Sequence, residues 1–202
     1  MSPTRALRRR AFRSAAALAG AAVLALAVAA CSSSGSSATG ESNFVGGTGE
    51  IAVVRPADRK PAPELSGKTV SGGQDSLAAH KGKVVVVNIW GSWCAPCIAE
   101  AANLVNVANA DRAKGVQFLG INTRDLVISN AARFEKNHQV PYPSLFDPYG
   151  KLMLRFPKGS LNPQSIPATM VIDRQGRIAV RALKALSEDE LNKIIDPIAA
   201  EK

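Results

Sequence analysis

The pattern of apolar and polar positions predicts an α/β domain in the middle of the chain. Residues 84–90 form an almost unbroken run rich in β-branched residues, which is typical of a strand buried on both faces. Apolar positions recur at helical spacing over residues 95–109, and residues 116–121 resemble a second buried strand. A further helix is expected over about residues 127–137. This alternation indicates a sheet that contains a parallel pair.

The second half of the chain predicts a hairpin and a last helix. Prolines punctuate the start of this half, and a short helix is expected near residues 150–156. Residues 168–173 and 178–182 are expected to pair as a β-hairpin across a polar turn. Ser187 can then cap the last helix, and Glu190 completes a capping box with it.

The first 30 residues have the pattern of a secretory signal peptide. Five arginines lie within residues 5–13, and residues 15–30 are almost entirely Ala, Leu and Val. This apolar run is short for a membrane span, which needs about 20 residues, so an uncleaved anchor helix is the alternative reading. Arg9 and Arg10 partly resemble the twin-arginine export pattern, which leaves the Sec and twin-arginine routes open.

A cysteine ends the apolar run. The sequence VAAC at residues 28–31 resembles the bacterial lipobox, which implies cleavage before Cys31 and attachment of a lipid to its sulfur. Acyl chains attached there would hold the protein stably on a membrane. Residues 31–54 begin with a Ser/Gly-rich stretch that cannot bury a core, and we expect a flexible tether there. The folded domain is then expected over residues 55–202.

The net charge of +9 does not indicate a nucleic-acid-binding protein. The signal-like segment carries five of the basic residues and no acidic one, which leaves 20 basic against 16 acidic residues in the rest of the chain. Those remaining basic residues are scattered singly and form no run on one predicted face. We therefore expect no nucleic-acid partner.

Two cysteines carry the candidate chemistry. Cys94 and Cys97 form a C-x-x-C motif where the first buried strand ends and a helix begins. The N–H groups and the dipole at a helix N-terminus favour a thiolate. We expect Cys94 at the exposed mouth of the turn as the nucleophile, with Cys97 one turn further in as the resolving cysteine. Pro96 suits the first helical turn, where an N–H would be unpaired in any case.

Half of a zinc site is the other reading of a single C-x-x-C motif. Zinc takes four ligands, and the only histidines are His80 and His138, which are far apart in the sequence. We therefore expect no metal, and no cofactor other than the redox-active disulfide.

The run GKVVVVNIWGSWCAPC at residues 82–97 resembles the TlpA/ResA branch of the thioredoxin superfamily. PAPEL at residues 61–65 and IPAT at residues 166–169 match that branch in type and order. The resemblance covers about residues 55–200. It implies a thioredoxin-like α/β fold with a central mixed β-sheet flanked by helices, an N-terminal extension and a central insertion.

The resemblance also implies roles for individual residues. Pro167 falls where the family has a cis-proline facing the cysteines, and Glu100 matches an acidic residue that tunes the buried cysteine and transfers protons. Asn88 stands where thioredoxin has a buried Asp, so that proton route is missing and Glu100 becomes more important. Four residues are expected to contact the substrate: Trp93, Ala95, Pro96 and Ile166.

The function implied is that of a monomeric, lipid-anchored thiol–disulfide oxidoreductase on the outer face of the cell membrane. It would reduce exported cysteine-containing proteins such as apocytochrome c, with electrons from a membrane thiol carrier of the CcdA/DsbD type. An oxidase with the same cysteine pair is the first alternative, since direction depends on the reduction potential. A peroxidase fits less well because its peroxidatic cysteine would stand alone. A tethered, non-enzymatic binding module is the alternative from another class.

Overall fold

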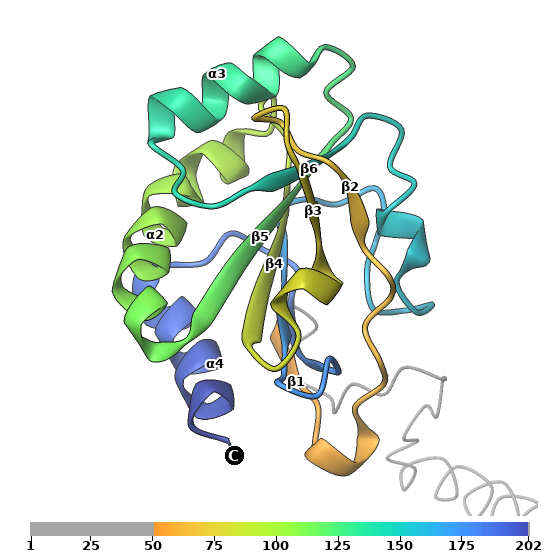
Figure 1. The fold of residues 1–202 in the computed structure, drawn as a ribbon, viewed down its shortest axis with the longest axis vertical. Helices are drawn as coiled ribbons and strands as arrows, with labels where there is room; N and C mark the ends of the chain where they lie inside the picture. Colours follow the sequence, from red (N-terminus) through yellow and green to blue (C-terminus); the bar gives the residue numbers. More distant parts are fainter. Residues whose placement is uncertain (1–50, 202) are drawn as a thin grey trace, which may run out of the picture. The chain divides into compact units, whose positions relative to one another are not determined.

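A computed structural model describes residues 51–201, which form a six-stranded mixed sheet with helices packed against it (Figure 1). The strand order is β1-β8-β7-β4-β5-β6. The β4–β5 and β5–β6 pairs are parallel, and the β4–β7, β7–β8 and β8–β1 pairs are antiparallel. The strands are β1 (Ile51–Val53), β4 (Val84–Trp90), β5 (Val116–Thr123), β6 (Ser144–Asp147), β7 (Ala168–Ile172) and β8 (Ile178–Ala182).

The central strand β4 is buried along its whole length because both faces of the sheet are covered. Val84 and Val86 pack into one cluster with side chains of α2 (Ala95–Asp111) and α4 (Glu188–Ala200). Val85 and Val87 belong to a second cluster, together with residues that precede β2 and follow β6. Side chains alternate between the faces of a strand, so a strand covered on both faces reads as a continuous apolar run.

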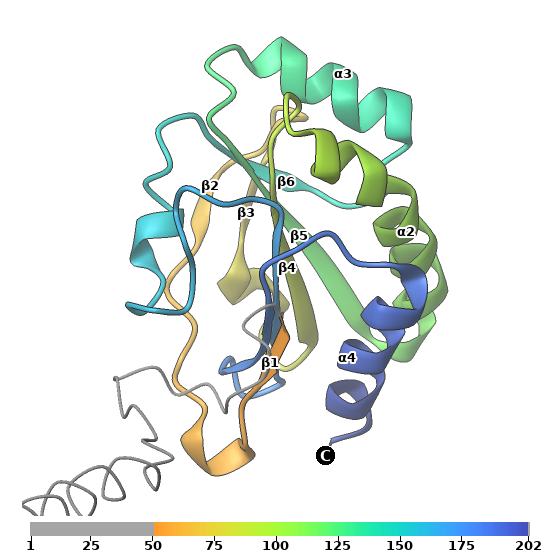
Figure 2. The same cartoon turned by 180° about the vertical axis from the view of Figure 1, so that it is seen from behind.

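Helix α3 (Ile128–His138) packs near the end of β4 from which the C-x-x-C segment leaves. Phe134 stacks on Trp90 with ring centroids 4.4 Å apart, and Ala131 joins the same cluster as Cys97. In both views, α2 lies between α3 and α4 beside the sheet (Figures 1 and 2). The redox segment therefore lies between the sheet and two helices.

Most of the predicted elements are confirmed, with small shifts at their ends. The helix expected over residues 95–109 continues to Asp111, and the one expected over 127–137 is α3. The helix expected near residues 150–156 is only a short 3-10 turn, Met153–Arg155. At the start of α4, the capping box between Ser187 and Glu190 is present as predicted.

A small antiparallel sheet, β2 (Ser66–Lys68) paired with β3 (Gln74–Ser76), is absent from the sequence prediction. These six residues are polar or glycine and show no apolar alternation. The chain after β2 is instead held by pairing with β6, since the Val70 N–H donates to the Ser144 carbonyl at 2.8 Å. Tertiary contacts rather than local pattern define these strands.

The expected boundary between tether and domain at residues 54 and 55 is wrong in one respect. Residues Ile51–Val53 pair with β8 as an edge strand, and the Val54 N–H donates to the Ala179 carbonyl at 2.8 Å. Val54 itself is almost completely buried. Three strand residues are too few to stand out beside a polar, glycine-rich stretch, so the domain includes residues that were assigned to the tether.

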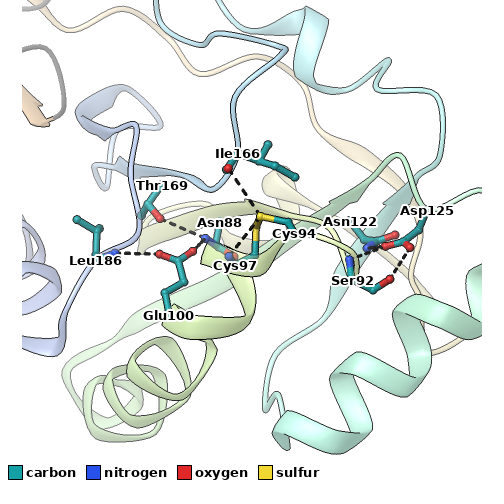
Figure 3. Close-up of a disulfide and its surroundings, with 10 residues drawn as sticks. All are labelled: Asn88, Ser92, Cys94, Cys97, Glu100, Asn122, Asp125, Ile166, Thr169 and Leu186. Carbon is teal, nitrogen blue, oxygen red and sulfur yellow. Dashed lines mark hydrogen bonds between the residues drawn. A yellow bond between two sulfur atoms is a disulfide. The ribbon is translucent and has the colours of Figure 1, made fainter.

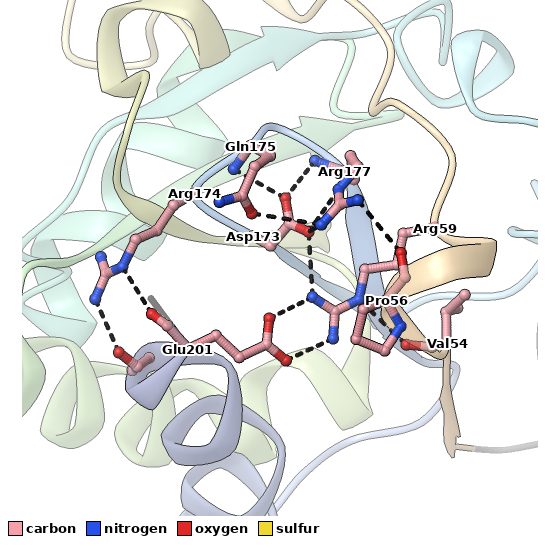
Figure 4. A network of polar contacts seen from close by, with 9 residues as sticks. Val54, Pro56, Arg59, Asp173, Arg174, Gln175, Arg177 and Glu201 are labelled. Atoms are coloured by element: carbon pink, nitrogen blue, oxygen red, sulfur yellow. Dashed lines mark hydrogen bonds and ion pairs between the residues drawn. The ribbon is translucent and has the colours of Figure 1, made fainter.

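Arg59 ties the start of the domain to its end (Figure 4). Its buried guanidinium forms ion pairs with Asp173, at 3.1 Å, and with Glu201, and its Nε donates to the Val54 carbonyl. Arg177 contacts the same Asp173 carboxylate at 2.9 Å. The network joins the segment after β1, the β7–β8 turn and the end of α4.

Within residues 51–201, no helix combines the length and the apolar character needed to cross a membrane. The signal peptide expected over residues 1–30, the lipidation site Cys31 and most of the expected tether lie outside the described residues.

Candidate active site

The C-x-x-C pair lies at the junction of β4 and α2 (Figure 3). The chain leaves β4 through a tight turn, in which the Cys94 N–H donates to the Gly91 carbonyl at 3.1 Å. Cys94 is the N-cap of α2, and its Sγ accepts a hydrogen bond from the Cys97 N–H at 3.2 Å. Pro96 is in the first turn of the helix, where it displaces no helical hydrogen bond. The two sulfurs are bonded to each other, so here the pair is a disulfide.

Cys94 is less accessible than the sequence analysis expects. Only 4% of Cys94 and 2% of Cys97 are exposed. The expectation of an exposed Cys94 is therefore wrong for the disulfide form, because neighbouring residues cover the sulfur. Its Sγ lies 3.7 Å from the Ile166 carbonyl oxygen. Trp93, Ala95 and Pro96, which were expected to contact substrate, are exposed around it.

The Ile166–Pro167 peptide bond is cis. It directly precedes β7, which pairs with β4 at the register Ile89–Ala168. This pairing brings Ile166 to the sulfur of Cys94 from the opposite side of the redox turn (Figure 3). The sequence-predicted residues Cys94, Cys97, Ile166 and Pro167 are thus brought together by the sheet, although about 70 residues separate the two halves of the site.

Glu100 is buried on the inner side of the disulfide, with 1% of the residue exposed. It is one helical turn beyond Cys97. Its Oε1 accepts a hydrogen bond from the Asn88 side-chain amide and its Oε2 accepts one from the Leu186 N–H, both at 3.0 Å. Burial raises the pKa of Glu100 to about 7, and the two hydrogen bonds act in the opposite direction. A carboxyl group with such a pKa can accept or donate a proton near neutral pH.

A second buried carboxyl group, Asp125, was not singled out from the sequence. It accepts hydrogen bonds from the Ser92 N–H at 2.8 Å, from the Ser92 hydroxyl at 2.5 Å and from the Asn122 amide at 2.7 Å. The sequence did contain a signal: Asp125 follows β5, and the ends of neighbouring parallel strands meet at one edge of a sheet. β5 pairs with β4 in parallel, so Asp125 reaches the turn before Cys94.

A sequence profile of the AhpC/TSA family matches residues 59–181, which include the whole redox site. The chain belongs to the AhpC/TSA family.

Two curated proteins that are similar in sequence to this AhpC/TSA chain are named as thiol–disulfide enzymes. The thiol:disulfide interchange protein HelX of Rhodobacter capsulatus is 36% identical over 120 residues, covering 59% of this chain and 62% of HelX, less than two thirds of its length. The thiol-disulfide oxidoreductase ResA of Geobacillus thermodenitrificans is 23% identical over 137 residues, covering 68% of this chain and 75% of ResA.

A solved structure supports the fold. The secreted thiol-disulfide isomerase of Corynebacterium glutamicum is 30% identical and aligns with a TM-score of 0.72, covering 79% of this chain and 98% of that protein. The expected thioredoxin-like α/β fold and the resemblance to ResA-type proteins are confirmed.

This AhpC/TSA protein is a thiol–disulfide oxidoreductase. Its relatives share that activity by name, and the structure holds the reactive pair as a disulfide at a helix N-terminus. A non-enzymatic binding module would not need a cysteine pair that can form a disulfide at this site. The peroxidase alternative requires an isolated cysteine, whereas Cys94 is bonded to Cys97.

Proposed function

We propose that the protein reduces disulfide bonds of exported proteins at the outer face of the cell membrane. The signal-like residues 1–30 and the lipobox-like ending at Cys31 support export and attachment by lipid. The secreted relative described above is consistent with work outside the cytoplasm. The tether that follows Cys31 would let the domain meet partners near the membrane surface.

The reductive cycle begins with Cys94. In the dithiol form its thiolate attacks one sulfur of a substrate disulfide, the substrate S–S bond breaks, and a mixed disulfide forms between Cys94 and the substrate. The second substrate sulfur leaves as a thiolate and takes up a proton from solvent. The position of Cys94 as N-cap of α2 favours its thiolate. Exposed Trp93, Ala95 and Pro96 would contact the substrate, and the Ile166 backbone beside cis-Pro167 would align it.

The second step uses Cys97. Its thiol transfers a proton to the Glu100 carboxylate, and the resulting thiolate attacks Cys94 Sγ. The mixed disulfide breaks, the substrate sulfur that was bonded to Cys94 leaves as a thiolate and takes up a proton from solvent, and the Cys94–Cys97 disulfide of the structure forms. Two electrons have then passed from the protein to its substrate. A membrane thiol carrier of the CcdA/DsbD type would return two electrons, and the two thiols would regain their protons.

The observation that carries the reductive direction is the pair of buried carboxyl groups on either side of the disulfide (Figure 3). Glu100 lies behind Cys97, and Asp125 holds the turn before Cys94. Negative charge in a region of low dielectric opposes formation of a thiolate nearby. Cys94 Sγ accepts a hydrogen bond from the Cys97 N–H and lies 3.7 Å from the Ile166 carbonyl oxygen, and neither of these groups is cationic. A dithiol that is less stable relative to its disulfide is a stronger reductant.

Apocytochrome c is the substrate that the resemblance to TlpA/ResA proteins favours. The cysteine pair to which haem is attached must be reduced before the haem can be joined. Such a pair lies in an unfolded chain, which can approach the backbone at Ile166 in an extended conformation.

The decisive experiment is the equilibrium reduction potential of the Cys94–Cys97 pair in the full-length protein, measured against glutathione and dithiothreitol couples. We expect a value near that of thioredoxin, about −270 mV. A value near about −120 mV, where the oxidant DsbA lies, would contradict the reductive direction and make the protein an oxidase.

A further inference from the structure

The connection between β5 and α3 exposes apolar side chains beside the redox turn. Leu126 is 74% exposed and Val127 is 55% exposed, and neither packs into a core cluster. They follow Asp125, which is hydrogen-bonded to Ser92, two residues before Cys94. Trp93 is also exposed. Large apolar side chains gathered at one place on a surface mark interaction sites more often than single exposed ones do.

The 124–127 segment is held in a fixed position despite its exposure. Arg124 has a φ of +60°, a conformation that residues other than glycine adopt infrequently. Its N–H donates to the Asp147 carbonyl at the end of β6. The Asp125 carboxylate is buried and accepts three hydrogen bonds from the redox turn and β5. The exposed side chains of Leu126 and Val127 are therefore presented at a defined place relative to Cys94.

The side chain of Val127 neither caps α3 nor packs into a core cluster. Val127 is the N-cap of α3, and no side chain caps this helix end. Ser, Thr, Asp or Asn at an N-cap would accept a hydrogen bond from the helix, whereas Val cannot. Val127 thus departs from two preferences: an apolar side chain is usually buried, and an N-cap residue usually has a polar side chain. Such exceptions tend to occur at functional sites.

Two cations accompany the apolar side chains. The Arg124 guanidinium lies 4.8 Å from the ring centre of Trp93, and the Lys151 ammonium lies 6.0 Å from that of the exposed Tyr149. Tyr149 and Lys151 are in the loop after β6, to which Arg124 is hydrogen-bonded through Asp147. Within residues 51–201, neither cation forms an ion pair with a carboxylate. Nε and one terminal nitrogen of Arg124 are buried without a hydrogen-bond partner, so a partner's carboxylate would approach the other terminal nitrogen of Arg124 or the Lys151 ammonium.

We propose that the apolar side chains of Leu126, Val127 and Trp93 form a docking surface for the substrate segment that carries the disulfide. The occupant is an extended polypeptide with an apolar residue beside its cysteine and a carboxylate that reaches Arg124 or Lys151. This inference deepens the proposed function, because it names the substrate class of the same site. It requires that the partner be a polypeptide disulfide or dithiol, and it does not depend on the direction of electron flow.

The test compares the full-length protein, purified in detergent, with a double variant, Leu126→Ser with Val127→Ser. The control is Val53→Ser, since Val53 is 51% exposed on β1 at the far edge of the sheet. The probes are a synthetic cystine peptide with Leu and Glu beside the cysteine, the same peptide with Ser and Lys there, and hydroxyethyl disulfide. The quantity measured is the rate constant for each peptide divided by that for hydroxyethyl disulfide.

We expect this ratio for the Leu/Glu peptide to fall about tenfold in the double variant, which is typical of a lost apolar contact, and to stay unchanged in Val53→Ser. The wild-type protein should also prefer the Leu/Glu peptide over the Ser/Lys peptide, and Arg124→Gln should weaken that preference. An unchanged ratio in the double variant, or equal rates for both peptides with the wild type, would overturn the proposal.

Two further measurements keep the outcome clear. Val127→Ser alone should not lower the melting temperature, since Ser can cap α3, so a lower ratio in that variant cannot be ascribed to unfolding. If the potential shows that the protein oxidises, the same ratio is measured with the dithiol peptides and the disulfide form of the protein. Failure of the reductive direction and failure of the docking surface are thereby separated.

Discussion

Asn88 donates a hydrogen bond from its side-chain amide to Oε1 of Glu100 at 3.0 Å, on the buried side of the Cys94–Cys97 disulfide. The same amide donates to the Thr169 hydroxyl at 3.3 Å. An amide cannot exchange a proton with a thiol at neutral pH. Asn88 therefore orients the Glu100 carboxyl group, which in the proposed cycle takes the proton of Cys97.

The first prediction concerns the pH dependence of stability. Burial raises the pKa of Glu100 from 4.5 to about 7, so the folded protein binds this proton more tightly than the unfolded chain. The resulting stabilisation is fully present below pH ~4.5 and is lost as the pH rises through ~7, an effect of about 3 kcal/mol. Relative to Glu100→Gln, the wild type should thus lose stability across this range.

Denaturant unfolding of the disulfide form checks this, because the bonded cysteines do not titrate. Glu64→Gln, at an exposed position, is the control and should follow the wild type. Burial also raises the pKa of Glu135, so the comparison is between variants rather than between absolute slopes. A constant difference between wild type and Glu100→Gln from acid to alkaline pH would contradict the assignment.

The second prediction separates the two cysteines. Cys94→Ser should abolish disulfide reduction, since no thiolate remains to attack the substrate. Cys97→Ser should still attack and then accumulate a mixed disulfide with the substrate, because the resolving thiol is missing. Mass spectrometry of the trapped adduct distinguishes the two variants. If Cys94→Ser lost disulfide reduction but kept the protein's function in the cell, a binding role would be supported instead.

The third prediction concerns Asp125. In Asp125→Asn the negative charge is removed and one of the donors of Ser92 or Asn122 loses its acceptor. We expect the Cys94 thiolate to form more readily and the potential of the pair to rise. A tenfold change in the equilibrium with glutathione corresponds to about 30 mV. Asp196→Asn on the exposed side of α4 should leave the potential unchanged; equal values for both variants would show that Asp125 has no effect on the thiolate.

The fourth prediction concerns the ion-pair network around Arg59 (Figure 4). Arg59→Met leaves the buried Asp173 with Arg177 as its remaining cationic partner. Removing one member of a buried ion pair costs about 3–5 kcal/mol, so the free energy of unfolding should fall by about 3 kcal/mol. Denaturant unfolding at neutral pH measures this. The reduction potential should not change, and a shift in the potential would mean that the network reaches the redox site.

Much of the fold could be predicted because its central elements have strong local signals. β4 is covered on both faces and is therefore uniformly apolar, and α4 begins with a capping box that can be read directly from Ser187 and Glu190. β1, β2 and β3 have only three residues each. β1 pairs with β8, which is distant in sequence, and β2 and β3 pair with each other although neither shows an apolar alternation. Tertiary contacts stabilise such short strands, and no local sequence pattern predicts them.

The site shows the same division. Cys94, Cys97 and Pro167 stand in recognisable motifs, and the sequence indicated that Glu100 could approach the sulfurs. The burial of Glu100 and the partners of its carboxylate arise from contacts with Asn88 on β4 and with Leu186, which is 86 residues away. Asp125 was missed because its partner Ser92 comes from another strand end. Burial of Cys94 was also missed, since Ile166 covers it from a distant loop.

The position of β1 has a mechanical consequence. The chain that precedes Ile51 joins the domain at the edge strand β1, whereas Cys94 follows the central strand β4, with β8 and β7 between them. A pulling force applied through the N-terminal chain would load the β1–β8 pairs first, together with the bond from Arg59 to the Val54 carbonyl. The strands that align Cys94 with Ile166 lie beyond this point of attachment. In the proposed tethered protein, force on the N-terminal chain would therefore strain β1 while the distance between Cys94 and the Ile166 backbone stays the same.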